Sequence, residues 1–223
     1  MRTLNKEDQE RITPQQALEI LNDGNKRFVQ NLKMNRNLLE QVNLTRNGQW
    51  PFAAILSCID SRTSAELIFD QGLGDIFSIR IAGNVINEDI LGSMEFACKV
   101  AGSKFIVVLG HSKCGAIKGA CDHVELGHLS GLLQKIQPAI NAETLTKENR
   151  NSSNSYFVEE VSRINVEQTV EQILEKSPVL TQLVEEGKIG IIGAMYDVSS
   201  GKVEFYNHTL VMKAEDHESI PVI

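Results

Sequence analysis

The chain alternates between short apolar runs and longer stretches in which apolar residues recur every three or four positions. Short runs rich in Ile, Val, Leu and Ala are typical of strands buried on both faces. The longer stretches are typical of amphipathic helices. The runs that we assign to strands are PFAAILSC (51–58), DIFSIRIAG (75–83), SKFIVVLGH (103–111), KIGIIGAMYD (188–197) and KVEFYNHTL (202–210).

Helical patterns separate these strands: SAELIFDQ (64–71), EDILGSMEFACKVAG (88–102) and VEQTVEQILEKSPVLTQLVEEG (166–187). A strand followed by a helix, repeated, predicts parallel βαβ crossovers. The last run follows the turn signal SSG, so it adds an antiparallel edge strand. The sequence therefore predicts an α/β fold with a four-stranded parallel sheet core, an added antiparallel edge strand and flanking helices.

The N-terminal part shows helix-like spacing from Thr13 to about Gln41, with Thr13 as cap and Pro14 in the first turn. We interpret residues 1–45 as a helical N-terminal arm and 50–210 as an α/β core, within a single domain over 1–223. The polar stretch 141–155 is a loop or helix boundary and not a domain linker. The apolar faces of the arm exceed what a small sheet needs, which favours a partner subunit.

Composition narrows the class of protein. The net charge is −7, so the overall field repels phosphate backbones and nucleic acid is not an expected partner. No run of about 18 apolar residues occurs, so we expect no membrane span. The start of the chain lacks the apolar core of a signal peptide, and we expect a cytoplasmic, soluble protein.

Reactive side chains follow two of the predicted buried strands. Cys58, Asp60 and Arg62 come directly after the first strand, and His111 and Cys114 follow the third. Parallel strands finish at the same edge of a sheet, where ligands bind in open α/β folds. Two thiolates and one imidazole suit zinc, and three protein ligands leave a fourth position for water, as in catalytic zinc sites.

The remaining reactive groups allow alternatives. Arg62 offers bidentate geometry that could orient Asp60 and hold it ionised, or Asp60 could itself be the fourth ligand and close the site. Cys98 and Cys121 lie in apolar helical patterns, so we interpret both as packing residues.

CIDSR (58–62), followed about fifty residues later by GHSKCG (110–115), resembles the C-x-D-S-R and H-x-x-C signature of the β-class carbonic anhydrases. The similarity extends over roughly residues 14 to 206. The resemblance implies one zinc ion per subunit on Cys58, His111 and Cys114, with Asp60 and Arg62 as a catalytic dyad. It also implies a homodimer built by the N-terminal helices, and often a tetramer or higher.

Residues around the expected substrate place the resemblance in the plant-type branch of that family. That branch has a Gln nine positions before the first Cys and a Phe about nineteen after it, here Gln49 and Phe77. Where its pocket carries a Tyr, this chain has Phe96. The other branch, which closes with Asp on zinc, has a Trp three positions before that Cys, and this chain has Ile55.

These observations lead to one functional hypothesis with two alternatives. We expect a carbonic anhydrase, a lyase that hydrates carbon dioxide reversibly to bicarbonate and a proton by a zinc-bound hydroxide. Asp60 accepts a hydrogen bond from that hydroxide, and Gln49 donates one to a substrate oxygen. The alternatives are hydrolysis of carbon disulfide or carbonyl sulfide on the same scaffold, and a non-catalytic, zinc-binding bicarbonate sensor.

Overall fold

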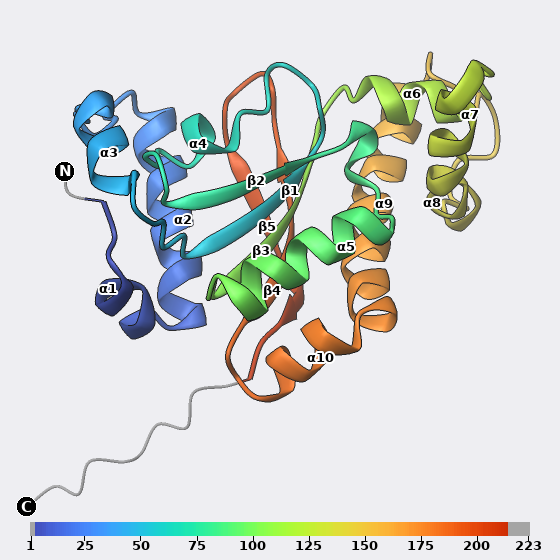
Figure 1. Cartoon of the computed structure of the whole chain (residues 1–223). Helices are drawn as coiled ribbons and strands as arrows, with labels where there is room; N and C mark the ends of the chain where they lie inside the picture. The colour runs from blue at the N-terminus through green and yellow to red at the C-terminus, as the bar shows by residue number, and fades with distance from the viewer. Residues whose placement is uncertain (1–2, 214–223) are drawn as a thin grey trace, which may run out of the picture.

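A computed structural model describes residues 3–213 of the chain (Figure 1). Its centre is a five-stranded sheet in the order β2-β1-β3-β4-β5. The strands are β1 (Ala53–Ser57), β2 (Ile76–Arg80), β3 (Phe105–His111), β4 (Gly190–Tyr196) and β5 (Val203–Val211). Strands β1 to β4 are parallel and β5 is antiparallel to β4. The predicted α/β fold and its antiparallel edge strand are thus confirmed.

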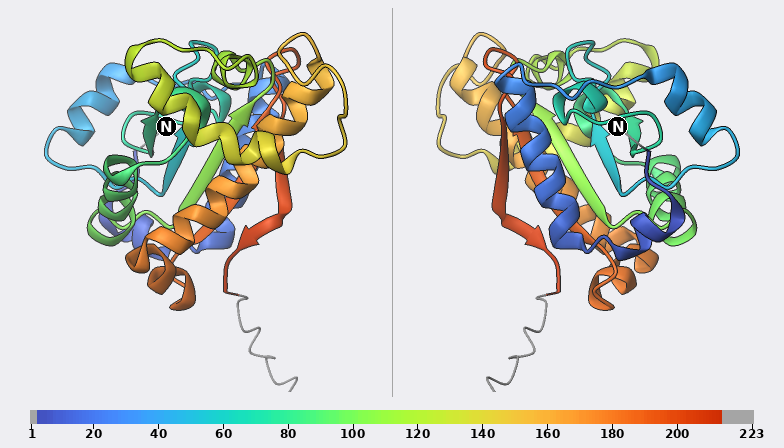
Figure 2. Two further views of the ribbon diagram at one scale, coloured as in Figure 1. Left: turned by 90° about the vertical axis from the view of Figure 1, so that its right-hand side faces the viewer. Right: turned by 90° about the vertical axis from the view of Figure 1, so that its left-hand side faces the viewer.

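Helices cover both faces of the sheet, which explains why β1 and β3 are buried throughout. Along β3, Val107 and Leu109 pack in one cluster with α2 (Pro14–Val29), whereas Ile106 and Val108 pack in another with α9 (Ser155–Lys176) and α10 (Pro178–Glu185). Successive side chains of a strand point to opposite faces, so α2 and α9 lie on opposite sides (Figure 2). α5 (Glu88–Glu95) joins α9 on its side.

A third apolar cluster lies beyond the carboxyl ends of the parallel strands. It is formed by α6 (Gly115–Cys121), α7 (Gly127–Leu133), α8 (Gln137–Ala142) and the first turns of α9, which Figure 1 shows side by side. Both Cys58 and Cys114 are buried in this cluster. The carboxyl edge of the sheet is therefore roofed by helices where ligands are expected to bind.

The N-terminal segment differs from the predicted helical arm. Thr13 caps α2 with a capping box, as expected, but the helix ends at Val29 and Asn31 adopts a left-handed backbone with φ of 55°. Helices α1 (Lys6–Arg11) and α3 (Leu38–Thr45) are separate elements. α2 buries its apolar face on its own sheet, while the segment after it leaves large apolar side chains exposed: Leu32, Met34, Leu38, Leu39, Val42 and Leu44.

Shorter elements complete the structure: α4 (Ala65–Ile68), η1 (Ala82–Asn84), a π-helical turn η2 (Phe96–Val100) and η3 (Gln134–Ile136). The helical pattern over 166–187 belongs to two helices, because Ser177 caps α10 and Pro178 occupies its first turn. Residues 143–154 form a loop between α8 and α9, within the stretch 141–155 that was predicted to be a loop or helix boundary. In the described part of the chain, no helix has both the length and the apolar content that crossing a membrane requires.

Candidate metal centre

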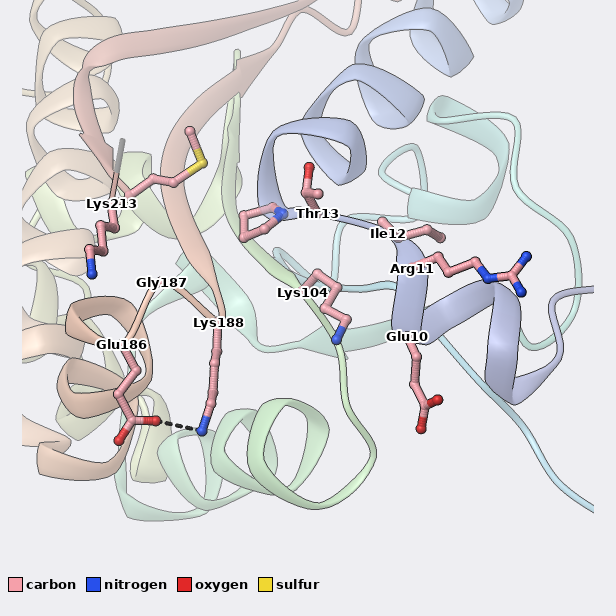
Figure 3. A pocket seen from close by; sticks show the side chains of 11 residues that line it. Glu10, Arg11, Ile12, Thr13, Lys104, Glu186, Gly187, Lys188 and Lys213 are labelled. Carbon is pink, nitrogen blue, oxygen red and sulfur yellow. Dashed lines mark ion pairs between the residues drawn. The ribbon is translucent and has the colours of Figure 1, made fainter. Parts of the chain in front are cut away.

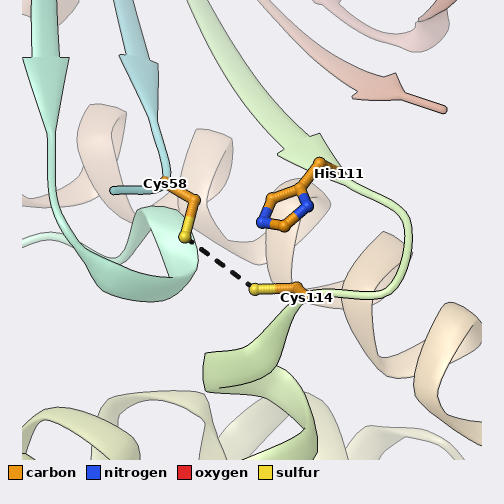
Figure 4. Close-up of side chains that lie close together, drawn as sticks. All are labelled: Cys58, His111 and Cys114. Atoms are coloured by element: carbon orange, nitrogen blue, oxygen red, sulfur yellow. Dashed lines mark hydrogen bonds between the residues drawn. The ribbon is translucent and has the colours of Figure 1, made fainter. Parts of the chain in front are cut away.

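Three buried side chains converge at the carboxyl edge of the sheet. Cys58 directly follows β1, His111 is the last residue of β3, and Cys114 precedes α6 (Figure 4). Ser57 pairs with Leu109, so the chain positions that follow β1 and end β3 are almost level. The ligand atoms all lie within 4.8 Å of one another, and within residues 3–213 no other group of three His, Cys, Asp or Glu side chains converges in this way.

The donor atoms of this cluster fit a metal ion. His111 Nδ1 lies 3.0 Å from the backbone oxygen of Ser112, and His111 Nε2 is buried without a hydrogen-bond partner. A buried ring nitrogen left unpaired is costly unless it binds something. The Sγ atoms of Cys58 and Cys114 are 4.0 Å apart. Zn–S bonds of about 2.3 Å in a tetrahedron place two sulfurs about 3.8 Å apart. Two thiols and one imidazole at these spacings suit zinc.

The electrostatics of the two cluster thiols differ from those of the other cysteines. The hydrogen bond with Cys114 lowers the pKa of Cys58, and the same bond, together with burial, raises the pKa of Cys114. The pair therefore carries one negative charge readily and needs a cation to lose its second proton. Burial alone raises the pKa of Cys98 to about 12, and burial followed by the charge of Asp122 raises that of Cys121 to about 11.

An ionised carboxylate stands beside the cluster. Asp60 Oδ2 lies 4.0 Å from His111 Nε2. Arg62 donates from Nε to Asp60 Oδ1 at 2.9 Å and from Nη2 to Asp60 Oδ2 at 2.7 Å. The Arg62 side-chain hydrogen bond, outweighing desolvation, holds the pKa of Asp60 well below its usual range. Asp60 is therefore ionised and a hydrogen-bond acceptor at neutral pH, and the Arg62 guanidinium binds both of its oxygens.

Two further side chains brace the turn that carries Cys58 and Asp60, and neither was predicted from the sequence. Arg80, the last residue of β2, donates from Nε to the Cys58 backbone oxygen at 3.1 Å and from Nη2 to the Asp60 backbone oxygen at 2.7 Å. Thr63 Oγ1 bonds to the same two oxygens at 3.0 and 2.8 Å. Arg80 lies in the predicted strand run DIFSIRIAG (75–83), which gave no sign of this role.

The residues expected to bind substrate lie elsewhere in the chain. Phe77 and Phe96 pack edge to face with ring centroids 6.3 Å apart and line a hollow of about 760 Å³ whose wall reaches Arg80. Phe77 pairs with Ala54, four residues before Cys58, which is about 13 Å along the strand. Gln49 is exposed and precedes β1, at the opposite end of that strand from Cys58. A substrate-binding role for these three residues stays a prediction.

A second hollow, of about 590 Å³, lies at the opposite edge of the sheet (Figure 3). Lys104 and Lys188, which precede β3 and β4, line it together with Thr13 at the start of α2. Lys188 forms an ion pair with Glu186 at 2.6 Å. Because this hollow faces the amino ends of the parallel strands, it is remote from the Cys58 cluster.

Comparisons with known proteins agree with this geometry. A family model described as carbonic anhydrase matches residues 53–203. A carbonic anhydrase of Mycolicibacterium smegmatis is 37% identical over 87% of this chain and 94% of its own. The b-carbonic anhydrase CafA of Aspergillus fumigatus is 26% identical, with a TM-score of 0.65 over 76% of this chain and 81% of its own.

A more distant structure shares the fold alone. It is one of two β-carbonic anhydrases from Sordaria macrospora that are described as tetrameric, 22% identical with a TM-score of 0.64 over 75% of this chain and 90% of its own. The family model matches more than half of the chain, and its span includes all three residues of the metal cluster. The resemblance noted in the sequence is thus confirmed, and the chain belongs to the β-class carbonic anhydrase family.

Proposed function

We propose that the chain catalyses the reversible hydration of carbon dioxide to bicarbonate and a proton, with one zinc ion held by Cys58, His111 and Cys114. The observation that carries the proposal is the convergence of these three donors beside the ionised Asp60 carboxylate. When bound, zinc would supply Lewis acidity, which lowers the pKa of a coordinated water below that of bulk water. The chain's own residues then have to orient the nucleophile and the substrate.

Asp60 orients the water-derived nucleophile, and Arg62 orients Asp60. Because the Asp60 carboxylate is ionised, it can only accept hydrogen bonds. The O–H of the nucleophile therefore donates to Asp60, which leaves a lone pair of the nucleophile's oxygen directed at carbon dioxide. Arg62 occupies both carboxylate oxygens, which favours this role over direct ligation by Asp60. The side chain of Asp60 is 17% exposed, whereas the ligand atoms beside it are buried. A proton can therefore leave towards solvent on the Asp60 side.

The substrate pocket and the assembly state belong to the same proposal. Phe77 lies on β2, an edge strand of the sheet, and Phe96 of η2 packs against it, while α3 leaves Leu38 and Leu39 exposed. Apolar surface of this kind favours an interface. We therefore propose that a single-domain subunit forms a homodimer, and from it a tetramer or higher. Gln49, Phe77 and Phe96 of one copy would then serve the metal centre of the other. The tetrameric fold relative supports this assembly.

The cysteines favour a reducing compartment. All four are free, and the Cys58 pair must remain reduced to bind a metal. We therefore expect a cytoplasmic enzyme whose partners are carbon dioxide and bicarbonate.

Matched cysteine variants test the proposed function. Cys58→Ser removes one donor, whereas Cys121→Ser changes a buried cysteine of the same apolar cluster that is not part of the metal group. We expect the first variant to lose zinc and stopped-flow carbon dioxide hydration, and the second to keep both. Wild-type protein that holds zinc but hydrates no carbon dioxide would reject the proposal in favour of a sulfur-analogue hydrolase or a bicarbonate sensor.

A further inference from the structure

A hydrogen bond to one of the cluster sulfurs comes from the backbone. Gly83 N–H donates to Cys58 Sγ at 3.3 Å, and both groups are buried. The carbonyl of the same Gly83 accepts a hydrogen bond from Asn165 Nδ2 at 2.9 Å, also buried. Asn165 is 4% exposed and lies on α9, 82 positions further along the chain. One buried amide from a distant helix therefore holds the residue that contacts the Cys58 sulfur.

The conformation of Gly83 leaves little freedom for another arrangement. Its φ of 69° is in the left-handed region, which favours glycine. A Cβ at this position would lie 2.9 Å from Ile136 Cδ1 and 3.3 Å from Ala116 Cβ. Ile136 and Ala116 thus pack closely against Gly83. Asn165 donates the hydrogen bond to the Gly83 carbonyl. Loss of the Asn165 amide would leave that carbonyl buried and unpaired, a state that the backbone relieves by moving.

We propose that Asn165 is a positioning residue for the metal centre, which keeps the Gly83 N–H aimed at Cys58 Sγ. This inference rests on the proposed function, because it takes Cys58 as a ligand. A hydrogen bond to a ligating sulfur withdraws electron density that the sulfur would otherwise donate to the metal. Two thiolates cancel the charge of a zinc ion, so a bond that reduces their donation preserves Lewis acidity where it is needed.

A structural role for Asn165 in docking α9 makes different predictions. Thr169 provides the matched control, because it lies on α9, is also 4% exposed, and donates from Oγ1 to the Asn165 backbone oxygen at 2.7 Å. Thr169→Val removes this buried hydrogen bond with almost no change in volume but leaves the Asn165 side chain in place. Asn165→Leu removes the amide donor and keeps the branched shape of the side chain, although leucine is larger than asparagine.

The test uses full-length protein with cobalt(II) in place of zinc. We expect the sulfur-to-cobalt charge-transfer band of Asn165→Leu to move to longer wavelength, because a sulfur without its hydrogen bond releases an electron more easily. The zinc-loaded variant should lose about 10- to 100-fold in kcat or in zinc affinity, with KM unchanged. Thr169→Val should match wild type in the band position and in kcat. Asn165→Ala replaces Asn165→Leu if the larger side chain prevents folding.

The outcomes separate the two proposals. A charge-transfer band that stays in place in a folded Asn165 variant, or that moves equally in Thr169→Val, overturns the positioning role. A wild-type protein that shows the band but no carbon dioxide hydration refutes the proposed function, while the band shift still reports on Asn165.

Discussion

Arg80 is the side chain whose removal most directly perturbs the turn between Cys58 and Asp60. Arg80→Met keeps the length and the apolar stem but deletes both hydrogen bonds to backbone oxygens of that turn. The ligand atom and the carboxylate on either side of the turn then lose a shared anchor. Thr63 still bonds to the same oxygens, so the turn is loosened and not lost.

The magnitude follows from these contacts. A hydrogen bond from a charged donor contributes about 1.5 kcal/mol or more when shielded from water. Arg80 is exposed, so water competes for each hydrogen bond and lowers its contribution to about 1 kcal/mol. If the full 2 kcal/mol or so is expressed in the transition state, kcat falls roughly 30-fold.

The assay is stopped-flow carbon dioxide hydration, with kcat, KM and zinc content measured on the same samples. Arg80→Lys keeps the charge but reaches one oxygen, so we expect an intermediate loss. Arg163→Met is the matched control, because the hydrogen bonds of Arg163 are to Glu160 and Glu167 on its own helix. An Arg80→Met enzyme with wild-type kcat, or with no larger loss than the Arg163 control, would refute the role of this brace.

Two further predictions concern assembly and stability. If Phe77 of one copy completes the site of the other, a dimer of one Asp60→Ala copy and one Phe77→Ala copy contains one intact site. We expect such mixed dimers to regain about half of wild-type activity. Activity no higher than that of the two single-variant proteins would place both residues in the site of one chain. Asp70→Asn should lower the free energy of unfolding by about 3 kcal/mol at pH 7, because the Asp70 side chain is 2% exposed and pairs with Arg27 and Arg36. Burial raises the pKa of Asp70, but the hydrogen bonds from these arginines outweigh it and the pKa is lowered. The greater stability of the wild type over Asp70→Asn is therefore present above pH 4 or so and is lost as the pH falls through the folded-state pKa. The free energies of unfolding of the two proteins, measured by denaturant titration, should converge in acid. A difference that does not depend on pH would contradict this.

The sequence predicted the strands and the convergence of the cluster well, for physical reasons. Buried parallel strands read as continuous apolar runs, and their common polarity brings Cys58 and His111 to one edge whatever the intervening loops do. The end of α2 was not predicted, because apolar spacing continues past Val29 while a left-handed Asn31 breaks the helix.

The supporting contacts could not be predicted from the sequence. Arg80 and Asn165 act on backbone oxygens, and nothing in an arginine or an asparagine reveals which distant carbonyl it will meet. The spacing of Phe77 from Cys58 along the chain likewise does not reveal at which edge of the sheet Phe77 lies. Nor does it reveal whether Phe77 lies near the metal centre of its own chain or of another copy. Such contacts depend on tertiary geometry that local patterns do not encode.

Reversible removal of the metal is the most direct test of the central claim. The purified protein is assayed for zinc per chain and for carbon dioxide hydration as isolated, after chelation, and after zinc is returned. We predict one zinc per chain, loss of hydration in step with loss of zinc, and recovery on its return. Hydration that survives complete removal of zinc, or its absence in the fully loaded protein, would contradict the account.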